Sequence, residues 1–272
     1  MGLRINQNIA AYNSYRNLTI TDGQMSRSLE KLSSGFRINR AADDAAGLAI
    51  SEGLRSQVGG LKMAVRNAQD GVSVVQTAEG ALTETHAILQ RMRDLAIQAS
   101  NDGSLDDAAK ANADAEYQQL ALELDDIALR TKFGGVALLD GNFDKTFQVG
   151  ANSGDTLGVT IGDMQAATLL TAVGDLTTAA NSTTALGNID TAISTVSTQR
   201  ANLGAVQNRI EHKINNLNVT IENLSASESR IRDTDMASER VAFTRSQILS
   251  QAGTAMLAQA NQAPQGVLQL LR

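Results

Sequence analysis

Few side chains of this sequence could do chemistry. The 272-residue chain has no cysteine, and its two histidines, His86 and His212, lie far apart in the sequence. The zinc-protease pattern H-E-x-x-H, the phosphate-binding pattern G-x-x-x-x-G-K-[ST] and the dinucleotide pattern G-x-G-x-x-G do not occur. A chain without thiols has no disulfide, thiolate metal site or cysteine nucleophile. We therefore expect surface histidines, no metal, no cofactor and no enzymatic activity.

Two other polar patterns fit structural roles. Asp43 and Asp44 form a carboxylate pair, but adjacent residues of a helix point in different directions, so capping or salt bridging explains them better than acid–base catalysis. Four sequons of the form N-x-[ST] begin at Asn17, Asn181, Asn218 and Asn223. Three of them fall in expected helices, so chance matching explains them better than glycosylation.

The net charge of −6 is unevenly distributed along the chain. Residues 1–66 carry +4, residues 67–199 carry −12 and residues 200–272 carry +2. The sequence has no dense basic patch for nucleic acid, and no run of 18 apolar residues for a membrane span. The first residues also lack the apolar region of a cleaved signal peptide. We expect no nucleic-acid partner, no membrane partner and no cleaved signal.

The elements that must position any site are long helices. Apolar residues from Leu54 to Val75 follow steps of four and three, as in a coiled-coil seam, and the pattern loses strictness after Glu79. A second stripe repeats every seven residues over 189–231, which would span on the order of 65 Å as one helix. A third helix fits 113–127, where Ser104 and Asp107 resemble a capping box. The expected fold is mainly α: long antiparallel helices in a rod, a coiled-coil-like bundle.

Residues 133–188 have a different character. Leu157, Val159 and Ile161 alternate with small or polar residues, which is the period of a strand. Turn residues at 140–142 and 152–154 flank the run around Phe147. We expect a small β-hairpin near 133–165 and no large inserted domain.

Both ends of the chain are predicted to form helices with an apolar face. Residues 246–271 contain no charged residue but many glutamines, so this helix is expected to be buried against protein, either its own core or a partner. A membrane-surface helix is disfavoured because the polar face lacks Lys and Arg. The apolar residues on these helices include Ile5, Ile9, Leu18, Leu29, Leu32, Ile248, Leu249, Met256, Leu257, Val267, Leu268, Leu270 and Leu271.

Several strings of this sequence closely resemble the signatures of bacterial flagellin. In the N-terminal half these are SLEKLSSG at 28–35, RINRAADDAAGLAIS at 37–51, RNAQDG at 66–71 and ILQRMRDL at 88–95. In the C-terminal part they are LGAVQNR at 203–209, SRIRDTD at 229–235 and MLAQAN at 256–261. The sequence departs mildly at Gly134, where the family usually has Asn.

The resemblance implies a structural subunit that polymerises into the flagellar filament, the propeller for swimming. It implies that the terminal helices, 1–44 and 235–272, pair with each other, and that the apolar residues named above for these helices form an inner filament core. It also implies a rod domain over 45–234 without outer domains. It also implies an extracellular location reached through the flagellar type III apparatus. The implied partners are further copies of the chain, an export chaperone on 235–272, and filament cap and hook-junction proteins.

The resemblance further implies recognition by the innate immune Toll-like receptor 5 through Arg91, Leu95 and Glu116, although these residues could equally be lattice contacts. Three alternatives remain open. A hook–filament junction protein shares such ends, some flagellin-derived chains carry a protease insertion, and a secreted adhesin can also be a coiled coil.

Overall fold

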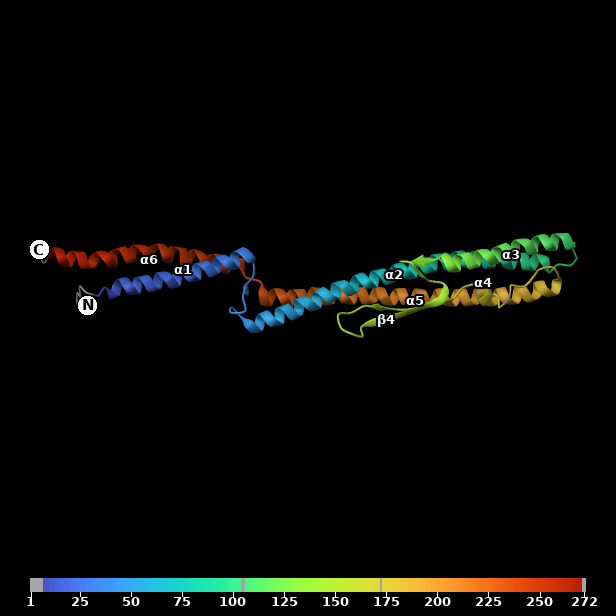
Figure 1. The fold of residues 1–272 in the computed structure, drawn as a ribbon, viewed down its shortest axis with the longest axis horizontal. Helices are drawn as coiled ribbons and strands as arrows, with labels where there is room; N and C mark the ends of the chain where they lie inside the picture. The colour runs from blue at the N-terminus through green and yellow to red at the C-terminus, as the bar shows by residue number, and fades with distance from the viewer. Residues whose placement is uncertain (1–6, 104–105, 172, 271–272) are drawn as a thin grey trace. The chain divides into compact units, whose positions relative to one another are not determined.

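The computed structural model describes residues 7–103, 106–171 and 173–270, with the backbone alone over 263–270. Its helices are α1 (Ile9–Ser34), α2 (Ala45–Ala99), α3 (Asp107–Arg130), α4 (Ala166–Leu169), α5 (Ala179–Arg232) and α6 (Met236–Leu270). Its strands are β1 (Lys132–Phe133), β2 (Val136–Ala137), β3 (Asp140–Gln148) and β4 (Thr156–Asp163). The expected mainly α fold with a small hairpin is confirmed (Figure 1).

The chain forms two compact units. One consists of residues 57–222, and the other joins the two ends of the chain, up to residue 56 and from 223 onward. The predicted boundaries at 44/45 and 234/235 concern roles within a filament and remain a prediction. No helix in the described part of the chain is long and apolar enough to cross a membrane.

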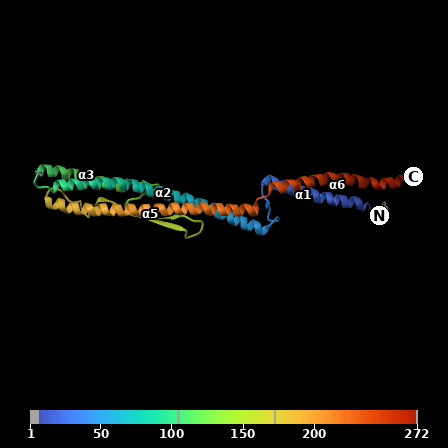
Figure 2. The same cartoon turned by 180° about the vertical axis from the view of Figure 1, so that it is seen from behind.

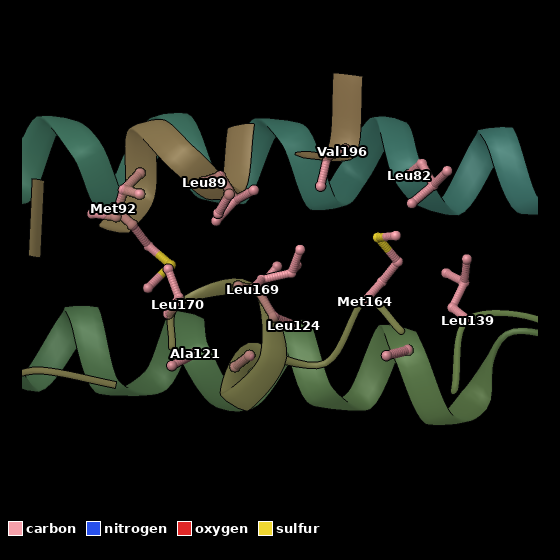
Figure 3. Close-up of a cluster of buried hydrophobic side chains, with 14 of the residues drawn as sticks. Leu82, Leu89, Met92, Ala121, Leu124, Leu139, Met164, Leu169, Leu170 and Val196 are labelled. Carbon is pink, nitrogen blue, oxygen red and sulfur yellow. The ribbon is translucent and has the colours of Figure 1, made fainter. Parts of the chain in front are cut away.

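The core of the 57–222 unit forms where α2, α3 and α5 meet the segment around α4. Side chains of all four regions converge in Figure 3, where Leu89 and Met92 of α2 lie opposite Leu124 of α3, with Leu169 and Leu170 between the helices. These five side chains are all almost completely buried.

The buried seam of α2 is more regular than its hydrophobicity suggests. The expectation that the pattern weakens after Glu79 is wrong, because steps of three and four continue without a break to the end of the helix. Several of these positions, such as Thr85, Ala96 and Ala99, hold small or polar residues that allow close packing. The buried seam is Leu61, Ala64, Ala68, Gly71, Val75, Ala78, Leu82, Thr85, Leu89, Met92, Ala96 and Ala99.

The helix α5 carries the predicted seven-residue repeat. The buried positions of this repeat in the 57–222 unit are Ile189, Val196, Leu203, Ile210 and Leu217. Ile210 of α5 and Phe147 of β3 both lie beside Gly71 of α2, where a Cβ would meet each at 3.5 Å. The hairpin is therefore fixed against the middle of the α2–α5 pair.

The hairpin pairs β3 with β4 in antiparallel register, with Phe147 opposite Leu157 and Phe143 opposite Ile161. One face of β4, comprising Leu157, Val159 and Ile161, is buried, as the alternation predicted. The turn expected at 140–142 is wrong, because these residues belong to β3 at an irregularity in the pairing. Gly141 takes a φ of 78° there, which glycine adopts without strain.

A second, shorter hairpin joins β1 to β2 and was not predicted. Gly134 and Gly135 form its two-residue turn with φ values of 57° and 86°, the positive pair that a type I′ turn requires. Asn and Gly are the residues that best tolerate this conformation. The departure at Gly134 therefore keeps the backbone geometry of the turn.

The turn between α2 and α3 differs from the predicted capping box. Ser104 lies outside the described residues, and the N-cap of α3 is Asp106, which accepts a hydrogen bond from the Ala109 N–H at 2.8 Å. Lys110 is buried on the first turn of α3 and pairs with Asp102 across the turn. This ion pair closes the connection between the two helices.

Candidate assembly surface

The helices α1 and α6 lie side by side in both views of the molecule (Figures 1 and 2). They run antiparallel, because Asn8 Nδ2 donates to the Ala260 carbonyl at 2.7 Å and Ser250 Oγ donates to Asp22 Oδ1 at 2.9 Å. The predicted pairing of the N- and C-terminal segments is confirmed.

The seam of this pair is built largely from small and polar residues. A Cβ at Gly253 would lie 3.3 Å from Leu18 Cδ1, so the two helices approach closely there. Ser28 and Ser246 are its most buried side chains. With steps of three and four, the half-buried or buried positions are Ala11, Ser14, Leu18, Thr21, Met25, Ser28 and Leu32 on α1, and Glu239, Phe243, Ser246, Ser250, Gly253, Leu257 and Ala260 on α6.

Most large apolar side chains of the pair point away from the seam. Ile9, Ile248 and Met256 are each about 60% exposed, and Leu29 and Leu249 are at least half exposed. Clustered exposed apolar residues mark interaction sites in soluble proteins. Leu18, Leu32 and Leu257 instead lie half-buried in the seam. The single apolar face expected of each terminal helix is therefore divided between two faces.

The outward-facing surfaces of the two helices, which together we call the outer face of the pair, each have a groove. One is lined on α6 by Val241, Ile248 and Leu249 with Arg240, Thr244 and Arg245. The other is lined on α1 by Ile9, Tyr12, Tyr15 and Ile20 with Asn13, Arg16 and Thr19. Tyr15, Ile20 and Val241 are exposed assembly candidates that were not predicted from the sequence, and asking which apolar residues fall outside the seven-residue seam would have found them.

Some predicted assembly residues cannot be placed. Ile5 and Leu271 lie outside the described residues. Val267, Leu268 and Leu270 belong to α6, but the structure does not describe their side chains.

The segments that lead into α1 and α6 are fastened to each other. Gly35 ends α1 with a φ of 76°, and its carbonyl accepts a hydrogen bond from the Thr234 N–H at 3.0 Å. The Arg37 N–H donates to the Arg232 carbonyl at 2.7 Å. The guanidinium of Arg232 lies 4.9 Å from the centre of the Phe36 ring and also pairs with Glu52. The Arg232 side chain is only 14% exposed. Its cation–π contact with Phe36 is therefore more stabilising than the same contact between fully exposed side chains.

Asp44 caps the start of α2, as expected, whereas Asp43 binds the turn before the helix. Asp44 accepts from the Gly47 N–H at 2.8 Å. Asp43 accepts from the Arg40 and Asn39 N–H groups, and these two donors lower the pKa of its carboxyl. His212 is exposed, whereas His86 is half-buried beside Gln90. Among the described residues, no group of three or more His, Cys, Asp or Glu side chains could hold a metal ion.

The predicted receptor residues lie in the 57–222 unit. Arg91 of α2 and Glu116 of α3 form an exposed ion pair at 2.7 Å. Leu95 lies one turn further along α2, but it is only 3% exposed and belongs to the hydrophobic core. The structure thus brings two of the three to one surface and places the third beneath it.

The comparisons with known proteins agree with this architecture. Residues 5–144 match the bacterial flagellin N-terminal helical region, and residues 186–271 match the bacterial flagellin C-terminal helical region. The chain belongs to the bacterial flagellin family. It is 51% identical to the flagellin of Bacillus subtilis (strain 168), with 99% of this chain and 100% of that protein covered. It is 53% identical to the flagellin of Halalkalibacterium halodurans, with 98% and 99% covered.

A solved structure supports the same assignment. The crystal structure of Bacillus cereus flagellin is 36% identical, has a TM-score of 0.51, and covers 56% of this chain and 88% of that chain. Family membership makes this chain a structural subunit of a flagellar filament, which lies outside the cell. Flagellin is a structural protein and not an enzyme.

Proposed function

We propose that the outer face of the α1–α6 pair is the surface through which subunits assemble into the filament core. The observation that carries this proposal is the exposure of Ile9, Ile248 and Met256, each about 60%. Burying one such side chain contributes about 1.5–3 kcal/mol. In a filament, neighbouring copies would cover this face. The terminal segments 1–44 and 235–272 are then the inner core, and 45–234 is the rod around it.

The name of one relative supports the same role. A flagellar filament 33 kDa core protein of Treponema phagedenis is 45% identical to this chain, with 98% of the chain covered. An open filament needs contacts between different surfaces of neighbouring subunits. The separate grooves on α1 and α6 provide two such surfaces.

Polymerisation of truncated and substituted chains tests the proposal. Deleting residues 253–272 is expected to leave a folded 57–222 unit that does not form filaments by electron microscopy. Ile248→Asp is expected to block filaments while keeping α6. Gln251→Asp is its matched control, because it adds the same charge at an exposed polar position of the same helix. Normal filaments from Ile248→Asp would contradict the proposal.

Further partners follow from the family resemblance. The export chaperone is expected on 235–272, since α6 presents its apolar face to any partner before assembly. Export through the type III apparatus, and contact with cap and hook-junction proteins, belong to the same proposal. Titrating the chaperone into the full chain and into the 1–234 fragment measures the first point. Equal affinity for both would place the chaperone elsewhere.

Recognition by Toll-like receptor 5 is proposed at Arg91 and Glu116, with Leu95 holding this stretch of α2 in the core. Arg91→Ala is expected to reduce the response of receptor-bearing cells to purified monomer. Arg93→Ala is the matched control, because Arg93 lies two residues away and forms its own 2.7 Å ion pair with Asp190. Equal responses to the two variants would assign the Arg91–Glu116 pair to the lattice alone.

A further inference from the structure

We infer that the outward face of α3 is a second contact surface, and that its partner is the stretch of α2 around Met63 in another copy of this chain. The inference rests on the proposed function, since it needs the chain to polymerise. It concerns a different part of the molecule from the α1–α6 pair.

The outward face of α3 has the spacing of a second helix seam. Gln119, Leu122, Asp126 and Leu129 follow steps of three, four and three, the pattern by which one helix packs on another. All four are exposed, with Leu122 at 60% and Leu129 at 50%. The inward face of the same helix is occupied separately, by the buried residues Ala113, Tyr117, Ala121, Leu124 and Ala128.

The short hairpin after α3 extends this exposed apolar face. Phe133 and Val136 are paired across β1 and β2 and are 37% and 45% exposed. β1 begins two residues after α3 ends, and the Leu138 N–H donates to the Thr131 carbonyl at the end of the helix. The hairpin is thereby held at the same end of α3 as Leu129. Leu122 and Leu129 of α3 and Phe133 and Val136 of the hairpin are thus four exposed large apolar side chains along this stretch of the chain.

Charge selects the kind of partner that fits. The helix α3 has six carboxylates and two cations. Asp114 and Asp125 already accept hydrogen bonds from the backbone N–H groups of Leu176 and Ala166. At the exposed leucines, Asp126 pairs with Arg130 one turn along the helix at 3.0 Å, whereas Glu123 forms no ion pair with any residue that the structure describes. A partner should therefore combine apolar side chains with positive charge.

The chain itself carries such a surface on the first part of α2 in the 57–222 unit. Residues 57–66 contain no carboxylate. Lys62, Met63 and Arg66 are all exposed, and Met63 is 48% exposed. Neither cation forms an ion pair with any residue that the structure describes. This surface is complementary to α3 in both charge and apolar character.

A contact between these two surfaces suits an open polymer. The surfaces lie on different helices, so a second copy that uses its α2 surface still presents its own α3 to a third copy. Such heterologous contacts propagate into a filament and do not close into a dimer. An α3–α3 contact would instead place Glu123 and Asp126 against like charges.

Substitutions at Leu122 test the surface. Leu122→Asp is expected to raise the critical concentration for polymerisation by about tenfold, the effect of losing one well-buried apolar side chain. Leu122→Met keeps the apolar area and serves as the matched control. Both variants should keep the unfolding midpoint of the unchanged monomer. Normal polymerisation of Leu122→Asp would overturn the inference and leave the α1–α6 proposal untouched.

Cysteine cross-linking identifies the partner, because the unchanged chain has no cysteine. A Leu122→Cys chain and a Met63→Cys chain are polymerised together and oxidised with copper phenanthroline. A covalent dimer is expected in the mixed filament and not in filaments of either variant alone. A dimer from Leu122→Cys alone would overturn the assignment in favour of an α3–α3 contact.

Two further outcomes are informative. If Leu122→Asp is impaired but the mixture gives no dimer, α2 is overturned as the partner. If the unchanged chain itself does not polymerise, the proposed function fails, and this inference fails with it.

Discussion

Leu122 and Leu124 lie two positions apart on α3, and substitutions at these positions distinguish a role in assembly from a role in folding. Leu124 is completely buried in the core of the 57–222 unit, whereas Leu122 is 60% exposed. Replacing a fully buried leucine with alanine removes its transfer free energy and leaves a cavity, which destabilises a protein by about 3 kcal/mol. Replacing an exposed leucine changes stability by about 0.5 kcal/mol or less. We expect Leu124→Ala to destabilise the monomer strongly and Leu122→Ala hardly at all.

The measurement is urea unfolding of dilute, monomeric chain. Near-ultraviolet circular dichroism follows Tyr117, the buried tyrosine in this core, while Tyr12 and Tyr15 are exposed on α1. For a unit of this size, about 3 kcal/mol also lowers the melting temperature by roughly 6–12 °C. Equal destabilisation by the two variants would refute the assignment of an inward and an outward face to α3.

Three further predictions concern single groups. Burial, with a smaller effect of Asp114, raises the pKa of Tyr117 to about 12, so the folded state holds this proton more tightly than the unfolded state. Its contribution to stability is complete below pH 10 and is lost as the pH rises towards 12, and a Tyr117→Phe variant should lack this loss in alkaline urea titrations. Gly135→Ala is expected to destabilise the 57–222 unit by about 1–2 kcal/mol because of its positive φ, whereas Gly134→Asn should be tolerated; equal effects on unfolding would argue against the type I′ turn. The lowered pKa of Asp43 stabilises the connection before α2 above pH 3.8, and this effect is lost as the pH falls through the pKa of the folded state. Asp43→Asn should therefore speed amide exchange at Arg40 at pH 7, and the difference should disappear once the pH is low enough to protonate Asp43.

The long helices and their pairing could be predicted because apolar residues at steps of three and four line up as one continuous stripe only on a helix. The prediction failed after Glu79 because Thr85, Ala96 and Ala99 are not strongly hydrophobic, yet they occupy seam positions where small side chains fit. The β1–β2 hairpin was missed because two-residue strands carry too little alternation to stand out.

The assembly residues were only partly predictable for a related reason. A hydrophobicity count treats Ile9 and Leu18 of α1 alike. The structure separates them, because Leu18 packs in the seam beside Gly253 and Ile9 faces outward. Arg91 and Glu116 form one ion pair, but their sequence separation gives no sign of it before α2 and α3 are folded together.

The seam between α1 and α6 determines how the ends of this chain behave before they meet neighbours. Ser14, Ser28, Ser246 and Gly253 offer little apolar area, so pairing alone gains little free energy. The helices of an isolated subunit should open often, and their amide protons should exchange with deuterium far faster than those of α2. In a filament, outward residues such as Ile248 are covered by neighbouring subunits. The α1–α6 pair can then open only if these contacts between subunits are broken as well. The rate of deuterium exchange at the terminal amides therefore distinguishes the monomer from the filament without attaching a dye or tag to the chain.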